Sequence, residues 1–192
     1  MKLLLHICCA PCSVACIESL RAEGIDVYGL WYNPNIHPFS EYKARKNTLR
    51  AYAESISLKL FCEGDYGLRQ FICETPSIEF GRRCEYCYNI RTDFAAQFAA
   101  ENGFDAFSTT LLISPYQNHE LLKRSAEKSA EKFKTEFLYR DFRPLFRDGQ
   151  QKARDLGLYM QKYCGCIFSE EERYRKRNKI LRDNEKYGFA ER

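Results

Sequence analysis

Cysteine is the residue type in this chain best suited to metal binding and redox chemistry, and its positions are clustered. Most of the ten cysteines fall in three short segments that lie far apart: Cys8-Cys9-Ala10-Pro11-Cys12, Cys84-Glu85-Tyr86-Cys87 and Cys164-Gly165-Cys166. In a reducing cytosol, clustered cysteines indicate metal binding or catalysis rather than a disulfide framework. We predict that the fold brings the three segments together.

The spacing of Cys84 and Cys87 at a predicted helix start puts both sulfurs on one face, which suits zinc, an iron–sulfur cluster or a redox dithiol. With Cys8, Cys9 and Cys12 there are five soft ligands, more than one tetrahedral zinc ion uses. Two thiolates about 4 Å apart repel by roughly 4 kcal/mol at an effective dielectric constant near 20. Either most thiols stay protonated, or they hold more than one metal centre. Alternatively, Cys8 or Cys9 packs behind the strand.

The third segment, Cys164-Gly165-Cys166, is too tight for both sulfurs to bind one metal ion comfortably. Cysteines this close in a turn can form a strained disulfide, and strained disulfides tend to be labile or catalytic. We therefore predict that Cys164 and Cys166 form a redox-active pair that stores two electrons, with a purely structural turn as the alternative. The remaining cysteines fall on apolar stripes and are predicted to lie in the core: Cys16, Cys62 and Cys73.

Asp65 and His37 are the candidate acid–base groups. Asp65 directly follows a predicted strand, so it is an oxygen ligand, a proton donor or a simple helix cap. His37 lies in an asparagine–proline loop and is either an acid–base group or a histidine satisfied by the backbone. Four tyrosines are candidates to stack on a planar ligand, although core packing explains an aromatic residue equally well: Tyr32, Tyr86, Tyr88 and Tyr116.

Strands and helices alternate along the chain, which predicts a mostly parallel sheet flanked by helices. The apolar run from Lys2 to Ile7 predicts a first strand, Pro11 suits a first helical turn, and Ser13 can cap the following helix. Ligands bind at the carboxyl ends of such strands, where the first cysteines are expected. The other predicted elements are strands at 26–32, 58–62, 106–112 and 136–139 and helices at 13–23, 40–55, 66–73, 87–101, 114–132 and 170–184.

The length of 192 residues predicts a single α/β domain, with a sheet core over about residues 1–140 and a helical C-terminal extension over about residues 141–192. The hydrophobic share of 45% argues against disorder. No apolar run approaches the roughly 20 residues that a membrane span needs. The start of the chain fits a buried strand better than a signal peptide. We therefore expect a cytoplasmic protein that does not contact a membrane.

The formal net charge of +4 is small, but basic residues concentrate in the last predicted helix. There Tyr174 is interleaved with Arg173, Arg175, Lys176, Arg177, Lys179 and Arg182. This segment is either a solvated helix face or a surface that contacts nucleic-acid phosphates.

Six motifs span nearly the whole chain: His6-Ile7-Cys8-Cys9-Ala10-Pro11-Cys12, Tyr32 to Pro38, Arg83-Cys84-x-x-Cys87-Tyr88, Thr109 to Tyr116, Asp141-Phe142-Arg143 and Leu158 to Ser169. In combination they resemble the QueH family of epoxyqueuosine reductases. The resemblance implies an adenine-nucleotide-hydrolase-like (Rossmann-like) α/β fold. It also implies a cobalamin-independent oxidoreductase that removes the epoxide oxygen from epoxyqueuosine at the tRNA wobble position, which gives queuosine.

The resemblance further implies a [4Fe–4S] cluster and a nearby mononuclear iron, or another divalent metal in its place. The family's ligands carry over onto Cys8, Cys9, Cys12, Cys84 and Cys87, with Asp65 as a weaker sixth. Cys8, Cys9, Cys84 and Cys87 are expected to bind the cofactor, while the division of sulfurs between the two metals stays open. Some relatives carry Asp in place of Cys12, which favours that position as the ligand of the single iron.

Conversion of an epoxide to an alkene needs two electrons and two protons and releases water. The resemblance predicts that the iron acts as a Lewis acid, that an electron donor of unknown identity feeds the cluster, and that Cys164 and Cys166 cycle between dithiol and disulfide. Asp65 or His37 would deliver a proton. A wobble base can be splayed out and stacked on aromatic residues. The predicted contacts to the tRNA anticodon arm are Tyr32, Asn33, Asn35, Tyr116, Arg82, Arg83, Lys162, Arg173, Arg175 and Arg177.

Two other functions remain as alternatives. An ATP-dependent tRNA thiolase has the same fold and uses cysteines to relay sulfur, but Cys8 and Cys9 occupy the place where such an enzyme needs a Ser-Gly-Gly phosphate loop. A zinc-stabilised RNA-binding protein without catalysis would explain the cysteines and the basic residues. It predicts a colourless protein that contains zinc.

Overall fold

The centre of the computed structural model, which describes residues 1–75, 79 and 81–175, is a parallel five-stranded sheet. The strand order is β3-β2-β1-β4-β5, and every neighbouring pair is parallel. The strands are β1 (Lys2–His6), β2 (Asp26–Trp31), β3 (Leu60–Cys62), β4 (Ala106–Thr109) and β5 (Glu136–Phe137). The predicted α/β class with a mostly parallel sheet is confirmed.

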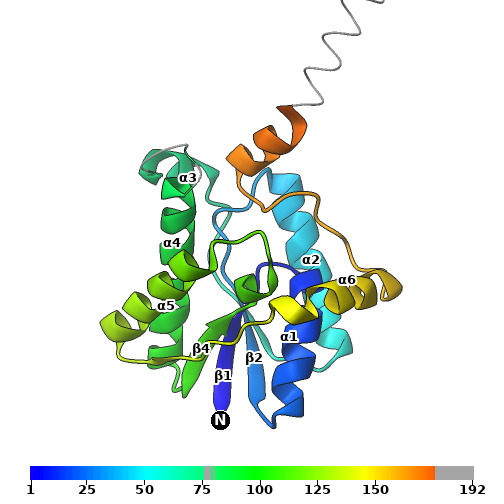
Figure 1. Cartoon of the computed structure of the whole chain (residues 1–192), viewed down its shortest axis with the longest axis vertical. Helices are drawn as coiled ribbons and strands as arrows, with labels where there is room; N and C mark the ends of the chain where they lie inside the picture. Colours follow the sequence, from blue (N-terminus) through cyan, green and yellow to red (C-terminus); the bar gives the residue numbers. More distant parts are fainter. Residues whose placement is uncertain (76–78, 80, 176–192) are drawn as a thin grey trace, which may run out of the picture.

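Helices cover both faces of this sheet (Figure 1). One face carries α1 (Ala10–Ala22), α2 (Phe39–Ser55) and α6 (Phe146–Asp155), and the other carries α4 (Arg82–Glu101) and α5 (His119–Phe133). Three shorter elements are α3 (Leu68–Glu74), η1 (Thr110–Ile113) and η2 (Arg143–Leu145). None of the helices in the described part of the chain is both long and apolar enough to span a bilayer.

The core lies in two layers, because successive residues of a strand point to opposite faces. In β1, Leu3 and Leu5 pack with the α1 side chains, whereas Leu4 packs with the alanines of α4. All three leucines are fully buried. Helix α6 approaches α1 closely at Gly149, where an added Cβ would lie 3.0 Å from the Ala15 Cβ. Each face of β1 is thus covered, as its continuous apolar sequence requires.

The strand order reverses between β1 and β4, because the chain passes from β1 to β2 on one side and later returns to β4 on the other. In open α/β sheets, ligands bind outside the carboxyl ends of the strands at this switch point. Cys8 follows β1 and Thr110 follows β4, and the Cys8 N–H donates to the Thr110 hydroxyl at 3.2 Å. The topology therefore places the first cysteine segment where ligands bind in such sheets.

The strand predicted over 106–112 ends earlier than expected, at Thr109. Its β-branched threonines favour a strand, but the Thr109 hydroxyl accepts a hydrogen bond from the Leu111 N–H at 3.2 Å. This side-chain cap starts the 3-10 helix η1 and turns the chain at the carboxyl edge of the sheet.

Two helices that carry cysteines begin before the predicted residues. Helix α1 begins at Ala10, with Pro11 in its first turn, and the Ser13 hydroxyl donates to the Ala10 carbonyl instead of capping the helix. Helix α4 begins at Arg82 rather than Cys87, so Cys84 and Cys87 both lie in its first two turns.

Two further helices differ in their bounds. Helix α5 begins at His119, capped by the Asn118 side chain, which accepts from the Leu121 N–H at 3.1 Å. The last predicted helix is observed over residues 167–175, and the remainder of that prediction, including Lys176, Arg177, Lys179 and Arg182, lies outside the described residues. The proposed division into a sheet core and a helical extension ending at residue 192 thus stays a prediction.

The three cysteines predicted to lie in the core have different environments. Cys16 is fully buried, and Cys62 is half-buried at the end of β3. Cys73 is exposed, so the prediction for this residue is wrong. The physical reason is that α3 is a short helix that buries Phe71 alone.

Candidate functional site

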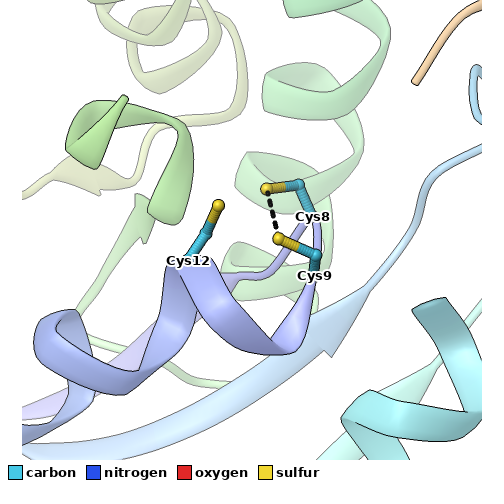
Figure 2. Close-up of side chains that lie close together, drawn as sticks. All are labelled: Cys8, Cys9 and Cys12. Carbon is cyan, nitrogen blue, oxygen red and sulfur yellow. Dashed lines mark hydrogen bonds between the residues drawn. The ribbon is translucent and has the colours of Figure 1, made fainter. Parts of the chain in front are cut away.

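Cys8, Cys9 and Cys12, which we name the first-loop thiols, converge at the carboxyl end of β1. Their sulfurs lie within 4.8 Å of one another, and all three residues are buried. Cys8 and Cys9 occupy the turn after β1, whereas Cys12 projects from the first turn of α1 toward the same space (Figure 2). The Cys8 and Cys9 sulfurs are 3.8 Å apart. This donor set could hold a soft metal ion.

The electrostatic environment separates the three thiols. Hydrogen bonds from Cys12 and Cys9, together with one from the Thr110 hydroxyl, lower the pKa of the Cys8 thiol. Burial raises the pKa of Cys9, and the hydrogen bond to Cys8 raises that of Cys12. Cys8 is therefore the preferred thiolate, as expected when three close sulfurs cannot all ionise without a cation.

A large cavity of about 840 Å³ opens above the first-loop thiols. Cys8 and Cys12 line it, and so do five cationic side chains: Arg45, Arg147, Arg154, Lys162 and Arg173. Its lining contains no aspartate or glutamate among the described residues. A cavity of this size with a thiol floor and a basic wall suits an anionic, nucleotide-sized ligand.

A second cavity of about 180 Å³ is lined by the other clustered cysteines, which we name the second thiol group: Cys84, Cys87, Cys164 and Cys166. The first two come from the start of α4, and the others come from the loop that precedes the helical residues 167–175. Burial raises the pKa of the Cys87 thiol, which the nearby Arg91 guanidinium opposes. All four thiols are free in this structure. We call this space the thiol cavity.

The predicted convergence of the three cysteine segments takes the form of two adjoining groups. Tyr116, Gln117 and Cys164 line both cavities. The Gln117 amide donates to the Cys164 sulfur at 3.4 Å. Among the described residues, only the first-loop thiols form a set of three metal-ligating side chains within 4.8 Å.

The Cys164-Gly165-Cys166 turn is held in place by buried polar groups of α2 and its preceding loop. Arg45, which pairs with the buried Glu41 at 2.7 Å, donates to the Tyr163 and Cys164 carbonyls at 2.9 Å each. The backbone N–H of His37 donates to the Gly165 carbonyl at 2.7 Å. Gly165 has φ +146° and lies against Arg45, which suits a residue without a side chain.

The two predicted acid–base residues lie outside both cavity linings. His37 is fully buried, its Nδ1 accepts a hydrogen bond from the Ile167 N–H at 3.3 Å, and burial lowers its pKa to about 4. The backbone thus satisfies one ring nitrogen, whereas the buried Nε2 has no hydrogen-bond partner among the described residues, and the acid–base role of His37 stays a prediction. Asp65 is exposed and lines neither cavity. Its role as a metal ligand or proton donor stays a prediction.

The aromatic and amide candidates divide between the site and the core. Tyr116 is exposed and lines both cavities. Asn35 lines the thiol cavity with its Oδ1 unpaired. Tyr32 stacks on Phe94 with ring centroids 3.7 Å apart, and Asn33 donates to the Ile7 carbonyl at 2.9 Å. These last contacts support the fold beside the site.

The described cationic residues that were predicted to contact tRNA lie at the large cavity, at the thiol cavity and on the exposed surface. Lys162 and Arg173 line the large cavity. Arg83 is buried, lines the thiol cavity and pairs with Glu172 at 2.7 Å. Arg82 is exposed, and Arg175 is exposed beside Glu171. Arg177 lies outside the described residues.

Sequence reasoning missed several side chains that contact the thiols. Gln161 donates to the Cys12 sulfur at 3.5 Å, Gln117 to Cys164, and Arg91 to the Cys87 sulfur at 3.0 Å. Arg91 follows Cys87 by one helical turn, a spacing that could have indicated it. Gln161 and Gln117 meet the thiols only through tertiary packing.

A solved structure resembles the fold of this chain. The U34-tRNA thiolase NcsA from Methanococcus maripaludis, solved with its [4Fe–4S] cluster, superposes with a TM-score of 0.57. The match covers 97% of this chain and 67% of the thiolase, at 13% sequence identity. This likeness shows the adenine-nucleotide-hydrolase-like fold alone.

Comparison of sequences identifies the family, which the structural likeness does not. The family model described as "Epoxyqueuosine reductase QueH" matches residues 3–172. The epoxyqueuosine reductase QueH of Dehalococcoides mccartyi is 37% identical over 92% of this chain and 97% of its own length. The QueH protein of Thermotoga maritima is 34% identical over 93% of this chain and 95% of its own length. The chain therefore belongs to the QueH family of epoxyqueuosine reductases, which are oxidoreductases.

Proposed function

We propose that this protein reduces epoxyqueuosine at the wobble position of tRNA to queuosine. The observation that carries the proposal is that two of the first-loop thiols, Cys8 and Cys12, line the large basic cavity. A flipped nucleoside needs a pocket of a few hundred Å³, and the flanking phosphates need cations. The cavity of about 840 Å³ meets both requirements.

The wall of the cavity is suited to hold the RNA. Arg147 and Arg154 lie two helical turns apart on α6, and Lys162 and Arg173 come from the following segment. None of these four has a carboxylate partner within 4.0 Å among the described residues. We propose that they bind phosphates beside the wobble base and that the exposed Tyr116 stacks on it.

The donor chemistry fits the metals that the family resemblance implies. The first-loop thiols supply three soft ligands within 4.8 Å, and Cys84 and Cys87 supply two more at the thiol cavity. We propose that these five cysteines hold a [4Fe–4S] cluster and a mononuclear iron. These cysteines would thereby supply Lewis-acid chemistry for the epoxide oxygen and a route for electrons.

The residues of this chain have their own tasks in the reaction. Gln161 and Gln117 donate toward the Cys12 and Cys164 sulfurs and so orient them. Cys164 borders both cavities, which suits the proposed redox pair with Cys166. The two electrons come from an external donor of unknown identity, and the two protons leave with the epoxide oxygen as water. We propose the exposed Asp65 as a proton carrier and assign His37 to positioning the Cys164-Gly165-Cys166 turn.

Anaerobic purification of the full chain tests this function. We expect iron and inorganic sulfide in the protein, and conversion of epoxyqueuosine to queuosine in tRNA, measured by mass spectrometry of nucleosides with a chemical reductant. ATP is left out of one reaction and added to another, because a tRNA thiolase would depend on it. A colourless protein that contains zinc and leaves the epoxide intact would contradict the proposal.

A further inference from the structure

Arg91 is a buried cation beside the second thiol group. It is 2% exposed on α4 and lines the thiol cavity. Its Nε donates to the Cys87 carbonyl at 2.9 Å, and its Nη2 donates to the Cys87 sulfur at 3.0 Å. Within the described ranges, no carboxylate oxygen lies within 4.0 Å of this guanidinium.

The other two buried arginines of the described chain differ from Arg91. Arg45 pairs with Glu41, and Arg83 pairs with Glu172. A buried charge without an opposite charge is costly, so buried cations are normally paired. Among its neighbours, the groups that can carry negative charge are the Cys87, Cys164 and Cys8 sulfurs and the Tyr88 phenol, with Cys87 interacting most strongly. The nearest of these groups is the Cys87 sulfur, which lines the thiol cavity, so a countercharge for Arg91 is best supplied there.

A second polar group in the same cavity lacks a partner. Asn35 is 2% exposed, lines the cavity and has an unpaired Oδ1. A cavity bordered by four thiols, a buried guanidinium and a buried amide favours an anionic, hydrogen-bonding occupant.

We propose that Arg91 is a positioning residue that raises the reduction potential of the sulfur-ligated metal centre at Cys84 and Cys87. The inference rests on the proposed function, because that function supplies the centre. Reduction adds a negative charge to a thiolate-ligated cluster, and a nearby cation with a hydrogen bond to a ligand sulfur stabilises the reduced form. Arg91 would thereby make electron entry into the site easier.

Redox titration of the iron-loaded full chain, followed by visible absorbance, tests this role. The variants are Arg91→Gln, which removes the charge, and Arg91→Lys, which keeps it. Thr92→Val is the matched control, because Thr92 is buried on the same helix next to Arg91 and does not line the thiol cavity. Iron content and thermal midpoint are measured for each protein.

We expect Arg91→Gln to lower the reduction equilibrium constant by about tenfold or more, which is about 59 mV for a one-electron couple. Arg91→Lys should shift the reduction potential less. Thr92→Val should lower the thermal midpoint but leave the reduction potential unchanged. If Arg91→Gln folds without iron while Arg91→Lys retains it, the need for the charge is also supported. An iron-loaded Arg91→Gln with the wild-type potential would overturn the inference, as would a wild-type protein without iron.

Epoxyqueuosine reduction by the wild-type chain is assayed in parallel. If the wild type holds iron but leaves the epoxide intact, the proposed function fails while the redox titration still decides the role of Arg91. If the wild type reduces the epoxide and the potentials of wild type and Arg91→Gln agree, only the role of Arg91 fails.

Discussion

The first-loop thiols and the second thiol group reach the same edge of the sheet by different routes. Cys8, Cys9 and Cys12 come from one strand–turn–helix segment, so a few backbone torsions set their geometry. The second group joins the start of α4 to a loop far along the chain. That loop depends on Arg45 and His37, which belong to neither cysteine segment.

This difference predicts how each group fails. The first-loop thiols sit between the buried β1 and α1, so their positions should depend little on the residues that hold the 164–166 turn. The second group should also respond to changes in the buried residues that hold the 164–166 turn. A buried network that closes a long loop is sensitive because each missing partner leaves another polar group unpaired.

The largest expected effect is that of Cys8→Ser. Loss of the preferred thiolate should reduce epoxyqueuosine reduction by at least about 100-fold and should lower the iron content. Iron analysis and nucleoside mass spectrometry measure both quantities. Cys62→Ser, at a half-buried cysteine outside both cavities, is the control and should retain activity. A fully active Cys8→Ser would show that the first-loop thiols are dispensable.

Arg45→Ala should affect the second group most strongly. It leaves Glu41 buried without its cation and frees two carbonyls of the turn, so the free energy of unfolding should fall by about 3–5 kcal/mol. Urea denaturation measures this change. Alkylation of native protein should show faster modification of Cys166, which is buried in the wild type. Equal stability and equal alkylation would mean that the turn does not depend on Arg45.

Acid should destabilise the protein through two buried histidines. Burial lowers the pKa of both His6 and His37 to about 4, from about 6.5 in the unfolded chain. Their neutral forms are thus favoured by folding, and this stability is complete above about pH 6.5 and is lost as the pH falls toward about 4. Urea denaturation at about pH 7, 6 and 5 should show a steeper loss for wild type than for His37→Asn. Parallel pH profiles would contradict the assignment to His37.

The smallest expected effect is on the salt dependence of RNA affinity. Arg147→Ala with Arg154→Ala removes two cations from the cavity wall. The slope of log affinity against log salt should fall by about 0.7 for each lost phosphate contact. Arg124→Ala with Lys128→Ala removes the same charge from exposed positions of α5 outside the cavities and is the control. Equal slopes for the two double variants would mean that the RNA does not bind at the wall of the large cavity.

Local patterns were enough to predict several features of this protein. The apolar run before Cys8 predicted a doubly buried strand, and the alternation of elements predicted a parallel sheet with its ligands at the carboxyl edge. The motif set indicated the family that the comparisons show. These features follow from short-range propensity and periodicity, which a single sequence carries.

Other features depended on tertiary structure. The cysteines divide between two cavities that share Tyr116, Gln117 and Cys164 in their linings, and nothing in the local sequence specifies that division. The buried charges of Arg45 and Arg91 were not predicted, because arginine is usually exposed and only packing reveals which guanidinium lacks water. The sequence alone therefore determined which residue types could do the chemistry. The tertiary structure decided which of them meet, because contacts between distant segments depend on how the whole chain packs.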